Sequence, residues 1–214
     1  STFGLLSRGK SIETAIYALA KVVKENPDVL YLIIGKTHPE VFKTEGESYR
    51  MYIEELISVL GLNANIRFVN SFVDKKTLED YLQATDIYLF TSIDPNQAVS
   101  GTFAYAMACG CPIVSTAIPQ ANDSLGPAGI VIDFNDAAQM AAAIQTILNA
   151  PERLSSMKQA ALQQIRPSAW QNVAIQHMNL IERCHSKKVK PIHFSLPAYN
   201  LSHFHGCTTQ VGML

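Results

Sequence analysis

The sequence has little of what marks several specialised classes of protein. Its 214 residues carry a net charge of −1, so no basic excess points to nucleic acid or an anionic membrane as a partner. No apolar run approaches the roughly 20 residues that a membrane-spanning helix needs. The first residues, STFGLLSRGK, lack the charged start, apolar core and cleavage site of a signal peptide. We therefore expect a cytoplasmic protein that binds no nucleic acid.

Cysteine is scarce as well. The four cysteines are Cys109, Cys111, Cys184 and Cys207. Reduced thiols are a simpler interpretation of them than a disulfide framework. Potential metal ligands gather near the C-terminal end: Cys184, His185, His193, His203, His205 and Cys207. Their spacing fits no zinc pattern, so we predict no metal site.

The composition, with 48% hydrophobic and 16% charged residues, is typical of a globular protein. The chain has no opening methionine and no obvious end after TTQVGML, which suggests a fragment of a longer protein. Periodic patterns continue to residue 184. Residues 185–214 contain prolines and histidines without a clear period. We expect one domain at 1–184 and an irregular tail or linker at 185–214.

Strand-like and helix-like patterns alternate along the predicted domain. The predicted strands cover residues 1–6, 29–35, 65–70, 86–91, 112–115 and 129–134. The predicted helices cover 12–26, 52–60, 75–84, 101–109, 140–148, 151–165 and 168–184. Several strands are continuously apolar, as in VLYLIIG, which is typical of strands buried on both faces. The pattern predicts an α/β, Rossmann-like fold with a six-stranded parallel sheet and helices on both faces.

Right-handed crossovers place the C-terminal ends of all parallel strands at one edge of the sheet. The loops expected at this edge are 6–11, 35–46, 70–74, 91–100 and 115–124. Ligands bind at this edge in open α/β sheets. The loop 35–46 is polar and long, so we expect it to have a function.

The turn Ser100-Gly101-Thr102 precedes a predicted helix at this edge. Free amides and the helix dipole make such a helix start an anion site, and phosphate is its usual guest. Ser100 fits the N-cap position, Gly101 lets a ligand approach the backbone, and Thr102 adds a hydroxyl. An alternative is that Ser100 only caps the helix and that Gly101 only fits a crowded turn.

The first loop, GLLSRGK, brings two cations to the same edge. Arginine can fork onto phosphate oxygens, and lysine acts as a mobile point charge. Arg8 and Lys10 could each be a solvated surface residue, but together with the Ser100 turn they favour a diphosphate ligand. The loop lacks the spaced glycines and the Gly-Lys-Ser/Thr ending of a P-loop.

Several segments resemble the C-terminal half of a retaining GT-B glycosyltransferase of the large group often numbered family four. These segments are FGLLSRGKSIETAIYALAKVV, LGLNANIRFVN, LEDYLQATDIYLFTS, AGIVIDFND and ACGCPIVST. The last of them is similar to the family's Ala-x-Gly-x-Pro-Val-Val-(Ala/Ser)-Thr signature. The resemblance implies that this half binds a nucleoside-diphosphate sugar and that a missing N-terminal domain binds the acceptor. It also implies that no metal or other cofactor is required.

The same resemblance assigns roles to individual residues. It implies that Lys10 meets the donor diphosphate, that the loop around Gln97 faces the sugar, and that Asn70 lies beside the base. Gln97 and Lys10 would then be the catalytic residues. The family usually has two glutamates in this region, but the chain has Gln97 and Tyr105 at those positions. Tyr105 offers a phenol in place of the carboxylate that holds the ribose hydroxyls.

One further departure from the family and three further side chains are expected at the same edge. The family's arginine after the first glycine falls at Leu5, so we expect Arg8 to take its role. His38 could contact the donor or only order its loop. Arg50 could reach phosphate or lie on a helix surface. Asp94 could replace a lost glutamate or only form a turn before Pro95.

Three functions remain open at this point. The first is transfer of a sugar from a nucleoside-diphosphate sugar to an acceptor with retention, with the isolated fragment inactive. The second is a GT-B nucleotide-sugar epimerase, although this pocket has few of the acidic residues that such enzymes need. The third is a non-catalytic module whose site has degenerated.

Overall fold

The computed structural model describes residues 1–185 of the chain, which divides into two compact units, Ser1–Gln164 and Ile165–Leu214. The described part of the second unit holds a short 3-10 helix, η3 (Arg166–Ser168), and the helix α9 (Trp170–His185). The predicted tail 185–214 lies outside the described residues except for His185. No helix in the described part is both long and apolar enough to cross a membrane.

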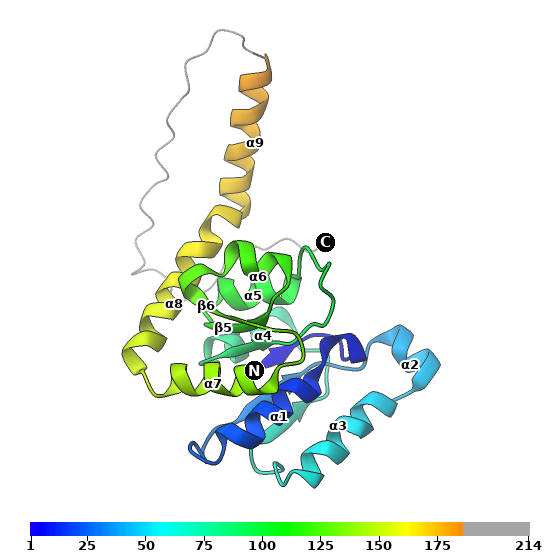
Figure 1. Ribbon diagram of the computed structural model, residues 1–214. Coiled ribbons are helices and arrows are strands. Elements are labelled where there is room, and N and C mark those ends of the chain that lie inside the picture. Colours follow the sequence, from blue (N-terminus) through cyan, green and yellow to red (C-terminus); the bar gives the residue numbers. More distant parts are fainter. Residues whose placement is uncertain (186–214) are drawn as a thin grey trace. The chain divides into compact units, whose positions relative to one another are not determined.

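The first unit is built on six parallel strands, as predicted (Figure 1). They are β1 (Thr2–Phe3), β2 (Tyr31–Ile34), β3 (Ile66–Val69), β4 (Tyr88–Phe90), β5 (Ile113–Thr116) and β6 (Gly129–Ile132). They form two ladders, β1-β2-β3 and β4-β5-β6. The amide of Leu89 donates to the Ser1 carbonyl at 2.8 Å, and the Ser1 ammonium donates to the Ile87 carbonyl at 2.8 Å. These bonds join the ladders in the order β3-β2-β1-β4-β5-β6, which is the Rossmann order.

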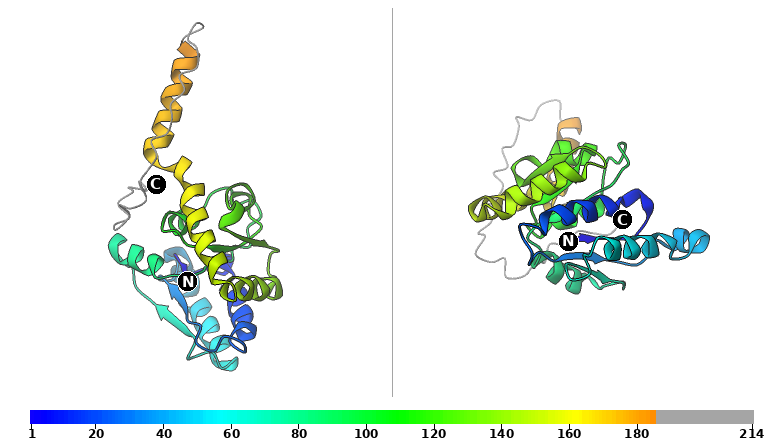
Figure 2. Two further views of the ribbon diagram at one scale, coloured as in Figure 1. Left: turned by 90° about the vertical axis from the view of Figure 1, so that its left-hand side faces the viewer. Right: turned by 60° about the horizontal axis from the view of Figure 1, so that its bottom comes forward.

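Helices cover both faces of the strands. They are α1 (Ile12–Val22), α2 (Pro39–Glu45), α3 (Ser48–Val59), α4 (Lys75–Gln83), α5 (Gly101–Ala108), α6 (Pro119–Ser124), α7 (Ala137–Leu148) and α8 (Pro151–Ile165). Helices α1 and α7 lie side by side and share the main hydrophobic core with α3 (Figures 1 and 2). Helix α5 lies across the strands from them, where the Phe103 ring meets the Phe90 ring edge-on at 5.7 Å.

The structure changes two of the predictions. The loop 35–46 is largely helical, because α2 begins at Pro39, whose fixed φ suits a first helical position. Helix α3 begins at Ser48, four residues before the predicted start at residue 52, and buries Tyr49, Ile53 and Ile57. The apolar residues Tyr52 and Val59, which also have helical spacing and lie in the predicted range, are exposed. The two isoleucines and the buried tyrosine form the face that packs on the core.

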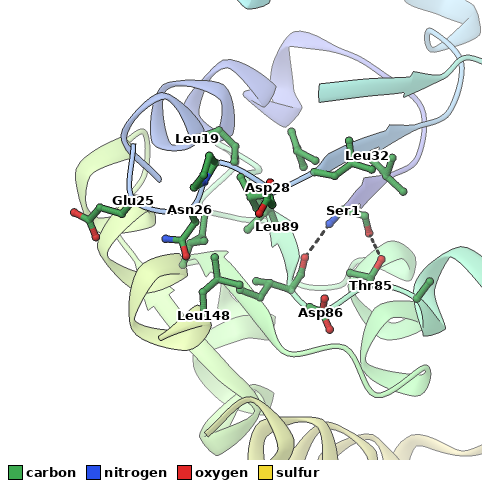
Figure 3. Close-up of a pocket in the computed structure, with 17 residues that line it drawn as sticks. Ser1, Leu19, Glu25, Asn26, Asp28, Leu32, Thr85, Asp86, Leu89 and Leu148 are labelled. Atoms are coloured by element: carbon green, nitrogen blue, oxygen red, sulfur yellow. Dashed lines mark hydrogen bonds between the residues drawn. The ribbon is translucent and has the colours of Figure 1, made fainter. Parts of the chain in front are cut away.

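A cavity of about 600 Å³ opens at the N-terminal edge of the strands. Ser1, Asn26, Thr85 and Leu148 are among its lining residues, and the Ser1 hydroxyl pairs with that of Thr85 at 2.8 Å (Figure 3). The cavity therefore lies at the opposite edge from the loops that carry the predicted ligand site.

Candidate functional site

The turn that carries Lys10 is held in place by the loop after β4. A short 3-10 helix, η1 (Arg8–Lys10), follows β1. The hydroxyl of Thr91 donates to the Lys10 carbonyl, and the amide of Ile93 donates to the Gly9 carbonyl at 3.1 Å. The next residue, Ser11, has a left-handed φ of 43°, which is uncommon for a residue other than glycine. Its hydroxyl is 3.1 Å from Oδ1 of Asn135, which is also left-handed.

The ammonium of Lys10 is the main electrostatic feature of this edge. It makes no hydrogen bond or ion pair with any residue that the structure describes. Burial lowers the pKa of Lys10 below its ordinary value, because a cation loses solvation inside the protein. A partly buried, unpaired cation is costly to keep, and an anionic ligand would complete its surroundings.

A glycine leaves room beside this ammonium. Gly4 follows β1 with a φ of +125°, a conformation that side chains rarely adopt. A Cβ atom at Gly4 would lie 3.3 Å from Nζ of Lys10 and 3.1 Å from Cγ2 of Thr102. Gly4, Lys10 and Thr102 therefore meet at one place, which brings the first loop against the start of α5.

The start of α5 has the geometry that the sequence predicts. Ser100 is the N-cap, and its hydroxyl accepts from the Phe103 amide at 3.4 Å and lies 3.0 Å from the Thr102 hydroxyl. Gly101 is exposed, and a Cβ atom added there would meet nothing within 4 Å. The idea that Gly101 fits a crowded turn is therefore wrong. The amides of Gly101 and Thr102 have no hydrogen-bond partner among the described residues, as an anion site requires.

Arg8 differs from Lys10 in its partners. Its Nε lies 3.4 Å from Oε2 of Glu45, and its guanidinium carbon lies 5.5 Å from the centre of the Tyr49 ring. The side chain is 59% exposed. Arg8 is therefore engaged by α2 and α3, and the structure brings only Lys10 of the two cations to the start of α5.

The loop between β4 and α5 and the helix α5 each hold one of the residues that stand where the family has carboxylates. The side chain of Gln97 is partly buried, and its backbone amide donates to the backbone carbonyl of Asp94 at 3.2 Å. The Asp94 carboxylate accepts from the Asn96 amide at 2.9 Å, so it has the turn-forming role that was one of its two interpretations. The Tyr105 ring packs edge-on against Phe3 of β1 at 6.1 Å. Its position on α5 leaves the phenol with no hydrogen-bond partner among the described residues.

The predicted residues of the second and third loops lie at the ends of their strands. His38 caps α2, since its Nδ1 accepts from the Glu40 amide at 3.2 Å. This contact supports the loop-ordering interpretation of His38. Asn70 follows β3 and is exposed. Arg50 is only 4% exposed, so it is neither a helix-surface cation nor a side chain open to a ligand.

No group of three His, Cys, Asp or Glu side chains among residues 1–185 is arranged to hold a metal ion. The cysteine and histidine set near the C-terminal end lies outside the described residues apart from Cys184 and His185. Within the described site, the groups that can attract a ligand are the Lys10 ammonium, two hydroxyls and the free amides of α5. This set fits an anion with several oxygens, such as a diphosphate.

Comparison with known proteins identifies the family of the chain. Residues 2–164 match the family model described as "Glycosyl transferases group 1". A D-inositol 3-phosphate glycosyltransferase of Corynebacterium urealyticum is 26% identical over 179 residues, which are 83% of this chain and 41% of that protein. The chain therefore spans less than half the length of this curated relative.

Solved structures share the fold. Sucrose-phosphate synthase from Thermosynechococcus elongatus superposes with a TM-score of 0.72 at 24% identity, over 86% of this chain and 44% of its own. The Anabaena protein HepE in complex with UDP superposes with a TM-score of 0.70 at 22% identity, over 86% of this chain and 47% of its own. The C-terminal domain of a group 1 family protein from Francisella tularensis gives 0.66 at 17% identity, over 77% and 84%.

Proposed function

Because this chain belongs to the glycosyl transferases group 1 family, we propose that it is the donor-binding domain of a retaining glycosyltransferase. The full-length protein passes a sugar from a nucleoside-diphosphate sugar to an acceptor hydroxyl. The observation that carries the proposal is the partly buried ammonium of Lys10, unpaired within the described residues, beside the open start of α5. Complexes of the similar protein HepE with UDP and UDP-glucose support a ligand of this class.

The site suits the charge that develops during transfer. The bond between the anomeric carbon and the diphosphate oxygen breaks as the acceptor oxygen bonds to the same face of that carbon. The leaving diphosphate gains negative charge, and one of its oxygens takes the proton of the acceptor hydroxyl. A fixed ammonium and aligned helix amides stabilise such charge without having to reorganise. Lys10 and the amides of Gly101 and Thr102 have this role in the proposal, since the amides of Ser100 and Phe103 already donate to Gln120 and to the Ser100 hydroxyl. Gln97 faces the sugar, Tyr105 and Asn70 face the nucleoside, and His38 orders the loop after β2.

The acceptor site belongs, in this proposal, to a separate N-terminal domain of the full-length protein. The curated relative has more than twice the matched length. The chain covers 44% of the length of the sucrose-phosphate synthase and 47% of the length of HepE. This chain alone is then expected to bind the donor weakly and to transfer nothing. Measurable transfer by the isolated chain would contradict this part of the proposal.

Titration calorimetry of the full-length protein with UDP, GDP and ADP at low salt tests the proposed site. We expect one nucleotide to bind, and the same titration identifies the base. Low salt is required because screening weakens phosphate contacts. If none of the three nucleotides binds, the proposed donor site is wrong.

Replacing Gly101 with alanine separates the ligand role of the α5 start from its structural role. The added methyl meets nothing within 4 Å, and alanine is the better helix former, so stability should stay the same or rise by up to about 1 kcal/mol. The methyl occupies the open approach to the free amides, so UDP affinity should fall about tenfold, or about 1.4 kcal/mol. Thermal unfolding and calorimetry measure the two effects. Unchanged affinity would mean that the ligand does not approach this backbone.

A non-catalytic module remains the second candidate, because Gln97 and Tyr105 replace the two family carboxylates. The double variant Gln97→Glu, Tyr105→Glu discriminates between the candidates by its affinity for UDP. A working variant site should lose affinity, since the double variant removes the Gln97 amide and the Tyr105 phenol that such a site uses. A degenerated site should gain affinity or show no change.

A further inference from the structure

The side chain of Arg50, in the first turn of α3, is buried under the C-terminal edge of the sheet. Its Nε donates to Oε2 of Glu47 at 3.1 Å, and its Nη2 donates to the carbonyl of Gly35 at 3.2 Å. Its guanidinium carbon lies 5.2 Å from the centre of the Phe68 ring. Arg50 thus ties the start of α3 to the loop after β2 and to β3.

The carboxylate that pairs with Arg50 is anchored as well. Glu47 also accepts a hydrogen bond from the buried hydroxyl of Thr37. This bond, together with those from Arg50, holds the pKa of Glu47 below its ordinary value. Thr37 lies in the loop after β2, and its backbone pairs with that of Leu6 in the first loop as an isolated parallel β-bridge. The Arg50 network therefore reaches both loops.

The neighbouring residue, Tyr49, holds the first loop directly. Its fully buried phenol accepts from the amide of Ile12 at 3.0 Å and donates to Oε2 of Glu13 at 2.6 Å. Its ring lies under the guanidinium of Arg8. Tyr49 and Arg50, which are adjacent in the first turn of α3, thus hold the loop after β1 and the loop after β2.

A pair of glycines connects the Arg50 contact to Lys10. Gly35, whose carbonyl Arg50 binds, has a φ of +133°, and a Cβ atom there would lie 2.1 Å from the Gly4 carbonyl oxygen. Gly4 in turn lies against the end of the Lys10 side chain. The peptide that Arg50 fixes is therefore packed on the peptide that borders the Lys10 ammonium.

We propose that Tyr49 and Arg50 are positioning residues of the donor site, which act by holding the loops after β1 and β2 so that Lys10 faces the start of α5. This inference rests on the proposed function, because it takes Lys10 to be the phosphate ligand. Neither residue contacts the ligand itself. The two side chains act through the backbone of Gly35, Gly4 and the Arg8–Lys10 turn.

The unfilled hydrogen-bonding capacity of Arg50 supports a positioning role over a purely stabilising one. Its Nη1 is buried and has no partner among the described residues. Buried ion pairs with unsatisfied groups are often replaced by apolar side chains without loss of stability. The Glu47 side chain is 36% exposed, so it stays hydrated without Arg50. Arg50→Met should therefore leave the unfolding temperature near the wild-type value.

The test compares UDP affinity in full-length variants by calorimetry. Arg50→Met should weaken UDP binding about tenfold, because small displacements of a positioned group have large effects. Arg67→Met, the same change at an exposed arginine on β3, should leave affinity unchanged. In a Lys10→Met background, Arg50→Met should have no further effect, within about twofold, because the two residues act through one contact. Equal losses in both backgrounds would overturn the inference.

A second readout works without any ligand and separates this inference from the proposed function. The pKa of Lys10 can be measured from the pH dependence of its acylation, read by mass spectrometry. If Arg50 keeps the loops packed around Lys10, both Arg50→Met and Arg50→Lys should move this pKa back toward its ordinary value. A shift in the methionine variant alone would be a charge effect and would contradict a positioning role. An unchanged pKa in both variants overturns the inference even where UDP binds.

Discussion

Replacing Lys10 with methionine should lower kcat/KM for sugar transfer by about 100-fold, the usual effect of removing one preorganised charge stabiliser. Methionine keeps most of the aliphatic stem, and no described residue loses a hydrogen-bond partner. Stability should hold or rise slightly, because a desolvated cation has been removed. Steady-state kinetics of the full-length protein and thermal unfolding measure the two effects.

Arg8→Met is the matched control for this result. Arg8 sits two residues away, but its side chain is 59% exposed and already engaged by Glu45 and Tyr49. Exposed pairs contribute little, so we expect a loss of kcat/KM below about tenfold. If Arg8→Met had the larger effect, Arg8 and not Lys10 would be the phosphate ligand, as the sequence comparison with the family arginine also allowed.

Replacing Gly35 with alanine should lower the free energy of unfolding by about 3–5 kcal/mol, near the upper end for a single substitution. The added Cβ would lie 2.1 Å from the Gly4 carbonyl oxygen, and this backbone atom cannot move without separating β1 from β2. The left-handed φ of +133° adds strain to the clash. Urea denaturation followed by circular dichroism measures the change.

Gly46→Ala separates the two causes of this loss. Gly46 also has a positive φ, of +62°, but nothing lies within 4 Å of the position of its Cβ. Only the conformational penalty applies, so about 1–3 kcal/mol should be lost. Gly35→Ala could lower the free energy of unfolding no more than Gly46→Ala does. In that case the backbone conformation alone, and not the packing of Gly35 on Gly4, would explain why position 35 requires glycine.

The backbone plan of this protein was accessible from its sequence, because period and turn chemistry are local. Apolar runs located the six strands, and Ser100 was placed correctly at the start of α5, since a cap depends only on its own helix. The helix α2 was missed although its signal was present. Proline is favoured at the first position of a helix, and Pro39 stands at that position in α2.

The residues that hold the site in place were harder to predict from the sequence. Whether an arginine near a helix start is exposed depends on what other segments present to it, and for Arg50 these are Gly35 and Phe68. Nothing in the local pattern around residue 50 indicates those partners. Arg8 and Lys10 look equivalent in the sequence, yet one is paired with Glu45 and the other has no partner in the described chain. Tertiary structure, not residue type, separates them.

The phenol of Tyr49 has a consequence for how the start of α1 is stabilised. Helix α1 lacks a local cap, because Ser11 is left-handed and makes no side-chain cap bond, and the amide of Ile12 is satisfied by Tyr49 instead. These partners are 37 residues apart in sequence. The first amides of a helix have no partner within the helix, so in the folded protein the Ile12 amide is satisfied within the protein only because α3 packs against α1. The start of α1, directly after the turn that carries Lys10, therefore depends on tertiary packing and not on a local cap.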